Sequence, residues 1–167
     1  MSFDDRIRQI LSLAEAMELN VLVWGPGQAS EHFAKREKIR QEIIGHFRNA
    51  DVRFSEDLEG RVPGAADLSL PEQELLHLAA CDVCVVLDTS KGAGEEIAHF
   101  VGSGFAHKLM ILTHKQYEGA SSFPASLRQY GNQLFYDDEE YNACSLVERV
   151  LTRLRQVAIG KMGGLLV

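Results

Sequence analysis

The sequence predicts an α/β fold, with a single doubly wound, flavodoxin-like parallel sheet that carries helices on both faces. Short apolar runs of strand length recur along the chain, and amphipathic helical segments separate them. Parallel strands need a crossover connection, usually a helix, and right-handed crossovers place helices on both faces of the sheet. About five strands predict the order 2-1-3-4-5, with a switch point between the first and third strands.

The strands are predicted from short runs that are rich in Val, Leu, Ile and Phe. In chain order they are residues 20–24, 51–54, 82–87, 108–113 and 134–136. The first ends at a Gly-Pro-Gly turn, and the last is the weakest because its apolar run is so short. The loops after the first and third strands should meet across the crevice at the switch point.

The helices are predicted from apolar residues at helical spacing with charges between them. In chain order they are residues 3–18, 34–47, 71–80, 94–101, 125–130 and 144–157. Pro71 suits the first turn of the third helix. A polar loop is predicted over residues 55–70, and the glycines of residues 160–167 predict a tail.

Length and composition indicate one domain over residues 1–167, with a predicted N-terminal helix within residues 1–18. The net charge of −7 argues against a nucleic-acid partner, because neutralising phosphates needs a surplus of Lys and Arg. We expect no membrane span, because no apolar run approaches the required length. Without a signal-peptide pattern, a cytoplasmic location is expected. The mixed charges of residues 35–40 predict a solvated helix face.

We predict neither a disulfide framework for the cysteines nor metal ligation by the histidines. The three cysteines favour buried small side chains over a disulfide framework. Cys81 and Cys84 have C-x-x-C spacing, but not at the start of a helix. The histidines show no zinc-ligand spacing, so no metal is expected. A G-x-S-x-G nucleophile motif is also missing.

The loop after the first strand, Gly25-Pro26-Gly27, lies where a dinucleotide fold places its phosphate-binding turn. It lacks the G-x-G-x-x-G pattern and a Walker lysine, so neither standard NAD binding nor P-loop hydrolysis is supported. Two interpretations stay open. The segment is either a simple turn, or a turn whose small residues allow a ligand to approach the backbone.

The segment after the third strand is the most specific candidate for chemistry. Polar residues end the strand, a Gly-Ala-Gly turn follows, and Glu95 and Glu96 are predicted in the first helical turn. There the helix dipole favours a carboxylate, which suits either a nucleophile that attacks an anomeric carbon or a group that stabilises an oxocarbenium-like transition state. The alternative is that acidic residues are simply preferred at this helix position. The substrate-binding candidates at this edge of the sheet are Gly25, Pro26, Gly27, Asp88, Ser90, Gly92 and Gly94.

These motifs resemble the nucleoside 2-deoxyribosyltransferase-like family, whose fold is related to that of TIR domains. The resemblance rests on the turn Trp24-Gly25-Pro26, on the strand pattern of residues 79–87 and on the helix start of residues 92–100. The strand at residues 108–113 also fits, so the similarity covers about residues 20–113.

The resemblance implies an N-glycosidic-bond enzyme that needs no cofactor. The family's nucleophilic glutamate falls on Glu96, because Glu96 is followed by Ile97-Ala98, and the family's strand aspartate falls on Asp82. The implied partner is a nucleoside, nucleotide or NAD, and a homo-oligomer is expected because neighbouring subunits complete the site in this family. A non-catalytic nucleotide-sensing or TIR-like interaction module is the alternative. A flavodoxin-like response or cofactor domain ranks third.

Overall fold

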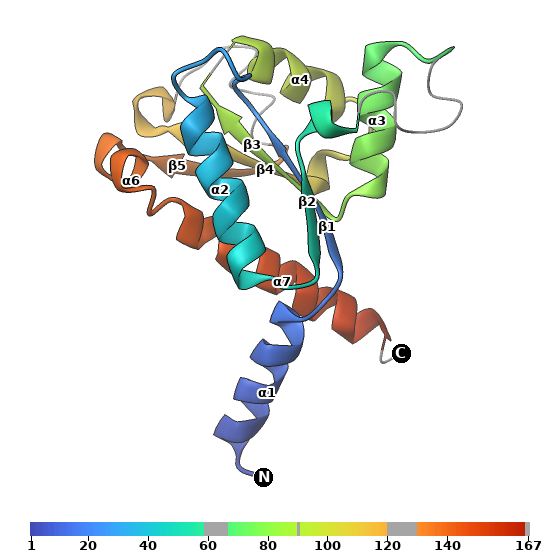
Figure 1. The fold of residues 1–167 in the computed structure, drawn as a ribbon, viewed down its shortest axis with the longest axis vertical. Coiled ribbons are helices and arrows are strands. Elements are labelled where there is room, and N and C mark those ends of the chain that lie inside the picture. The colour runs from blue at the N-terminus through green and yellow to red at the C-terminus, as the bar shows by residue number, and fades with distance from the viewer. Residues whose placement is uncertain (59–66, 90, 120–129, 166–167) are drawn as a thin grey trace.

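The computed structural model describes residues 1–58, 67–89, 91–119 and 130–165 (Figure 1). Its five-stranded sheet has the order β2-β1-β3-β4-β5, and every neighbouring pair is parallel, which confirms the predicted fold class. The strands are β1 Leu19–Trp24, β2 Ala50–Arg53, β3 Val83–Asp88, β4 Leu109–His114 and β5 Asn132–Tyr136. All six residues of the central strand β3 are buried, as expected of a sheet covered on both faces.

The helices of the described chain are α1 Phe3–Glu15, α2 Phe33–His46, α3 Leu70–Ala80, α4 Lys91–Val101, α6 Asp138–Ala143 and α7 Val147–Leu165. Single 3-10 turns occur at η1 Ser55–Asp57, η3 Ala106–Lys108 and η4 Lys115–Tyr117. Among the described residues, no helix combines the length and apolar character needed to cross a membrane.

Two hydrophobic cores lie on the two faces of the sheet (Figure 1). Val21 and Val23 of β1 face a core shared with α2 and α7. Leu22 and Trp24 face the other core, which α3 and α4 cover. This alternation follows from the two-residue repeat of a strand. Helix α1 stands outside both layers and projects from the body of the molecule (Figure 1).

Some predicted boundaries were wrong. Helix α4 begins at Lys91, so Gly92 and Gly94 lie in its first turn instead of in a turn before it. Helix α7 continues to Leu165, so most of the predicted tail is helical. The helical propensity of glycine is poor, but a cost of about 1 kcal/mol per residue is readily outweighed by tertiary contacts. The helix predicted over residues 125–130 falls almost entirely outside the described residues.

The cysteines are buried and free of disulfides, as expected. Cys81 directly follows α3 instead of lying on a strand, and it shares one core with Cys84. Burial raises the pKa of the Cys81 thiol to about 12, so the thiol is protonated at neutral pH. This environment fits packing and does not fit a redox role.

Candidate functional site

The ends of β1 and β3 meet at the switch point of the sheet, as the strand order predicts. Gly25 follows β1 with a φ of +141°, and a Cβ added there would lie 2.8 Å from the carbonyl oxygen of Leu87 in β3. Only glycine fits both this backbone conformation and this close approach. Gly27 has no atom within 4 Å of an added Cβ, so the steric requirement of the loop falls on Gly25 alone.

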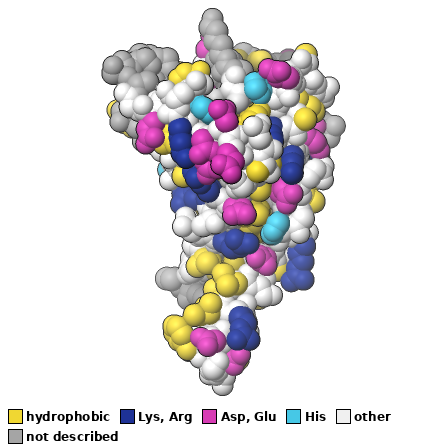
Figure 2. Space-filling view, turned by 90° about the vertical axis from the view of Figure 1, so that its left-hand side faces the viewer, with side chains coloured by type: hydrophobic (Ala, Val, Ile, Leu, Met, Phe, Trp, Pro, Cys, Tyr) yellow, Lys and Arg dark blue, Asp and Glu magenta, His cyan; other side chains and the backbone are white. Residues whose placement is uncertain are grey.

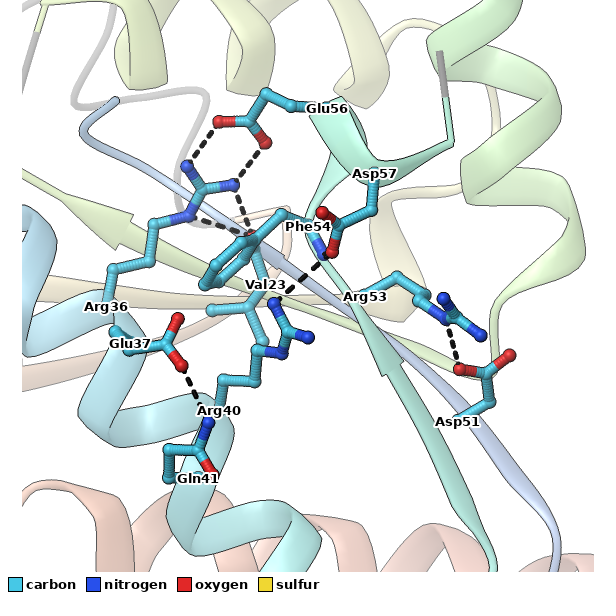
Figure 3. A network of polar contacts seen from close by, with 10 residues as sticks. All are labelled: Val23, Arg36, Glu37, Arg40, Gln41, Asp51, Arg53, Phe54, Glu56 and Asp57. Atoms are coloured by element: carbon cyan, nitrogen blue, oxygen red, sulfur yellow. Dashed lines mark hydrogen bonds and ion pairs between the residues drawn. The ribbon is translucent and has the colours of Figure 1, made fainter. Parts of the chain in front are cut away.

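A buried arginine holds this loop in place (Figure 3). Arg36 of α2 is 1% exposed and donates hydrogen bonds to the carbonyl oxygens of Val23 and Pro26. It also makes a two-pronged ion pair with Glu56, at 2.7 and 2.8 Å, and its guanidinium lies 4.3 Å from the centre of the Phe54 ring. The prediction that residues 35–40 form a solvated face is therefore wrong at Arg36.

The spacing of Arg36 from the apolar residues of α2 is a sequence signal for its burial. The mixed charges of residues 35–40 instead suggested a solvated face. Arg36 lies three and seven residues before Ile39 and Ile43, on the same buried helix face. Burial alone would raise the pKa of the Glu56 carboxyl, but the hydrogen bonds and charge of Arg36 outweigh it and lower that pKa below its ordinary value. The pair is therefore ionised at neutral pH.

The structure separates two of the predicted site residues. Asp82 precedes β3 at the amino edge of the sheet, where it accepts hydrogen bonds from the backbone N–H of Asn20 at 2.9 Å and from Lys161 Nζ at 3.0 Å. Asp88 ends the same strand, about 20 Å away by strand geometry. Asp82 therefore ties the amino ends of β1 and β3 to α7, and the fold does not bring it to the carboxyl edge.

Glu96 lies in the second turn of α4, not in the first, and its side chain is outside the described residues, as is Ser90. The helix dipole acts mainly within the first turn, so the expected dipole effect does not apply to Glu95 or Glu96. Helix α4 nonetheless starts three residues after β3, which puts its N-terminal end near the carboxyl edge of the sheet.

A pocket of about 310 Å³ opens at the carboxyl edge, beside the switch point. It is lined by residues that follow β1, β3, β4 and β5: His32, Asp88, Thr89, His114, Gln116, Tyr117, Tyr136, Asp138 and Tyr141. Only Asp88 among them was a predicted site residue. The others come from separate segments that the strand register brings together, and this grouping has no local sequence signal.

Aromatic and imidazole rings form one wall of this pocket. Tyr136 and Tyr141 stack with ring centroids 5.5 Å apart, and His114 meets Tyr136 edge-on. His32 Nδ1 shares a hydrogen bond of 2.7 Å with the hydroxyl of Tyr141. Burial raises the pKa of both tyrosines, so their hydroxyls stay protonated at neutral pH and above. The wall thus offers flat surfaces and neutral hydrogen-bonding groups.

His114 has a defined tautomer in its neutral form. Its Nδ1 lies 3.2 Å from the backbone nitrogen of Gln116, and because a backbone N–H can only donate, Nδ1 must accept. The proton of the neutral ring is then on Nε2, which faces Asp138 Oδ1 at 3.2 Å. Neutral His114 is thus a hydrogen-bond donor at Nε2, and its ring is oriented by Gln116 and Asp138.

Polar groups are also buried at the strand ends. Asp88 is 7% exposed and accepts a hydrogen bond from the Thr113 hydroxyl at 3.3 Å. The Thr89 hydroxyl and the Trp24 indole N–H are buried without a hydrogen-bond partner in the described structure. Such groups are rare in folded proteins, and Arg40 Nε on α2 is a third among the described residues. Among the described residues, no group of three or more His, Cys, Asp or Glu could hold a metal ion.

Comparisons with known proteins define the class of fold. The SEFIR domain of IL-17 receptor B aligns with a TM-score of 0.51 and 15% identity, over 84% of this chain and 97% of that domain. A conserved protein from Enterococcus faecalis V583 aligns with a TM-score of 0.49 and 16% identity, over 82% and 99% of the two chains. No family model and no curated protein sequence matches the chain.

The chain therefore has a TIR-like α/β fold, as the likeness to the SEFIR domain shows. At this level of identity the likeness is one of fold only.

Proposed function

We propose that this chain is a single TIR-like domain that cleaves the N-glycosidic bond of a nucleoside, nucleotide or NAD-like substrate at the carboxyl edge of its sheet. The observation that carries this proposal is the pocket of about 310 Å³ beside the switch point. Open α/β sheets bind ligands at this edge, and a pocket of this size and aromatic character suits one ring of such a substrate.

The charges around the pocket favour a neutral or cationic ring over a phosphate. Asp88 and Asp138 are in its lining, whereas the neighbouring Lys115 is held by Asp137 at 2.7 Å and by Glu140 at 3.3 Å. A stacked tyrosine face binds a flat base or a cationic ring, and the carboxylates repel an anion. The sugar and any phosphates would then extend from the pocket toward Gly25 and the start of α4.

The proposed chemistry assigns the nucleophile to Glu96. Its carboxylate attacks C1′ of the ribose or deoxyribose, a C1′–O bond forms, and the C1′–N bond breaks with its electron pair leaving on the base. A nicotinamide leaves as a neutral molecule. A purine or pyrimidine also takes up a proton as it leaves, which solvent water supplies. Water or a second base then displaces Glu96 and regenerates the enzyme.

The test is base release from a panel of nucleosides, nucleotides and NAD, measured by chromatography. The wild-type chain should release the base from at least one compound, and Glu96→Gln should abolish release with little change in thermal stability. Glu95→Gln is the matched control, because it removes the neighbouring carboxylate from the same helix turn and should retain activity. Base release by Glu96→Gln at the wild-type rate would contradict the assignment.

The second candidate is a TIR-like interaction or nucleotide-sensing module without catalysis. The observation that favours it is the exposed apolar face of α1, where Phe3 is 78% exposed and Ile7 is 42% exposed. The fold neighbour with the TM-score of 0.51 is itself a domain of a receptor. Calorimetry measures binding of the same nucleosides, nucleotides and NAD. Binding without release of base from any of them would favour this candidate over the enzyme.

A further inference from the structure

Two polar side chains are buried in the lining of the carboxyl-edge pocket. Asp88 is 7% exposed and Tyr136 is 3% exposed, whereas the other lining residues are half-buried or exposed. Burial raises the pKa of the Tyr136 hydroxyl, and the charge of Asp88 raises it further, so the two groups are near enough to interact. A ligand meets both of them away from bulk water, where a mismatched hydrogen bond is most costly.

The hydrogen bonds behind Asp88 determine the role of its carboxylate. A carboxylate accepts and does not donate, so the Thr113 hydroxyl directs its one proton to Asp88 Oδ2, at 3.3 Å. The oxygen of Thr113 then accepts from Gln133 Nε2, also at 3.3 Å. Thr113 is fully buried, so bulk water does not compete for these bonds. The chain of donors runs in one direction from β5 through β4 to β3, and it holds Asp88 as an acceptor.

The Tyr136 hydroxyl complements this acceptor. Within the part of the chain that the structure describes, it makes no hydrogen bond. Its ring is held in place by stacking on Tyr141 and by the edge contact with His114. A phenol can donate or accept, so this hydroxyl adapts to a ligand, whereas the Asp88 carboxylate does not.

The carboxylates at the rim of the pocket have different surroundings. The Asp138 side chain is 90% exposed and lies 3.2 Å from His114 Nε2, and the neighbouring Asp137 pairs with Lys115. Figure 2 shows acidic and basic side chains interspersed on the face of the molecule that carries α6. Solvent and opposite charges screen such groups, so the buried Asp88 has the larger effect on the choice of ligand.

We propose that Asp88 makes the pocket selective for a base that carries an exocyclic amino group, and that Thr113 is the positioning residue that holds Asp88 as an acceptor. This selectivity rests on the proposed function, because the base must occupy the pocket. Adenine and cytosine present an amino donor beside an acceptor ring nitrogen, which matches Asp88 and the Tyr136 hydroxyl.

Hypoxanthine and uracil present the opposite pattern, a carbonyl oxygen beside a ring N–H. With such a base, the carbonyl oxygen and the Asp88 carboxylate are two acceptors with no proton between them. Buried polar groups without partners are costly, and a site built for a hydrogen donor strongly rejects an analogue that lacks it. We expect a keto base to bind at least about tenfold more weakly than the matching amino base.

Calorimetric titration with two pairs of nucleosides tests the selectivity. Adenosine and inosine differ in the amino or keto group of the purine, and cytidine and uridine differ in the same way for a pyrimidine. The wild-type chain should bind the amino member of at least one pair tenfold or more tightly than its keto member. The absence of such a preference in both pairs, or no binding of any of the four, would overturn the proposal.

Substitution of Asp88 tests the residue itself. Asp88→Asn keeps the shape of the side chain and adds an amide that can donate to a carbonyl oxygen, so it should abolish or reverse the preference. Asp138→Asn is the matched control, because it makes the same change at the exposed rim and should keep the preference. Circular dichroism checks that each variant is folded. A folded Asp88→Asn variant with the wild-type preference would overturn the proposal.

Substitution of Thr113 tests the positioning role. Thr113→Val removes the hydroxyl and should reduce the ratio of the two affinities, whereas Thr113→Ser keeps the hydroxyl and should keep the ratio. A merely structural effect would weaken the binding of both nucleosides and leave their ratio unchanged. An unchanged ratio in Thr113→Val would therefore contradict this role.

Base release separates this selectivity from the proposed activity. Equal release of base from the amino and keto nucleosides would overturn the selectivity and leave the activity supported. Amino-selective binding without release of any base would support the selectivity and contradict the proposed cleavage.

Discussion

At the switch point, the position of Gly25 has no room for a side chain. Its φ of +141° and the 2.8 Å approach of an added Cβ to the Leu87 carbonyl oxygen both exclude a side chain. Gly25→Ala should lower the free energy of unfolding by about 2–4 kcal/mol, from backbone strain and steric overlap together. Denaturant titration measures this change.

The control for that substitution is Gly27→Ala in the same loop. An added Cβ at Gly27 meets no atom within 4 Å, so we expect a change within about 0.5 kcal/mol. Equal effects of the two substitutions would mean that the two strand ends do not approach each other as described.

Arg36 joins the loop after β1 to the chain after β2. Its removal should lower the free energy of unfolding. Arg36→Met leaves the buried carbonyl oxygens of Val23 and Pro26 and the Glu56 carboxylate without their donor. We expect a loss of about 3 kcal/mol in the free energy of unfolding.

Arg40→Met is the matched control for Arg36→Met. Arg40 lies one helix turn further along α2, over the same Phe54 ring, but its partner Asp57 is 3.3 Å away, and the Arg40 side chain is 26% exposed against 1% for Arg36. Its loss should cost about 1 kcal/mol or less. If the two variants unfold at the same denaturant concentration, the buried network does not stabilise the loop.

The residues of the candidate site differ in how far the sequence predicts them. A turn at Gly25-Pro26-Gly27 is predictable because glycines after a strand mark a turn, but the approach of Gly25 to Leu87 of another strand has no local signal. The pocket residues His32, His114 and Tyr141 were not predictable, because three different strand ends bring them together. Asp82 was grouped with Glu96 by motif, but the strand between them places Asp82 at the opposite edge of the sheet.

At the scale of elements, the continuation of α7 is the main difference from the sequence-based expectation. Lys161 donates to the carbonyl oxygen of Glu18 and to Asp82, and Met162 packs against the core. These contacts hold residues 160–165 in the helix despite their glycines. The glycine pattern is local, so it could not predict the contacts of Lys161 with the distant residues Glu18 and Asp82.

The glycines of α7 should therefore be sites of stabilisation. Gly160 is exposed in the helix, with no atom within 4 Å of an added Cβ. Gly160→Ala should raise the free energy of unfolding by about 0.5–1 kcal/mol, because alanine loses less conformational freedom in a helix. Thermal and denaturant unfolding would measure it. An unchanged stability would indicate that this stretch is not helical in solution.

The strands are the elements that the sequence predicts best. All five strands were expected within a few residues of their bounds, since buried parallel strands are nearly continuous apolar runs. The short helix α6 was missed, although its capping box at Asp137 and Glu140 is a local signal. The early start of α4 was missed because Gly92 and Gly94 suggest a turn by propensity alone.

At the scale of the whole molecule, strand order determines where a ligand can bind. The order 2-1-3-4-5 reverses between β1 and β3, and the pocket lies at the carboxyl ends of β3, β4 and β5 beside that reversal. Helix α1 lies at the other end of the molecule, next to the last turns of α7 (Figure 1).

NMR titration tests whether the carboxyl-edge pocket binds a nucleoside-like ligand. The ¹⁵N-labelled chain is titrated in turn with adenosine, adenosine monophosphate and NAD, and the amide shift changes are mapped on the structure. We expect saturable changes for at least one compound, concentrated at Thr89, Gln116 and Tyr141. No saturable change with any of the three, or changes centred away from the ends of β3, β4 and β5, would contradict it.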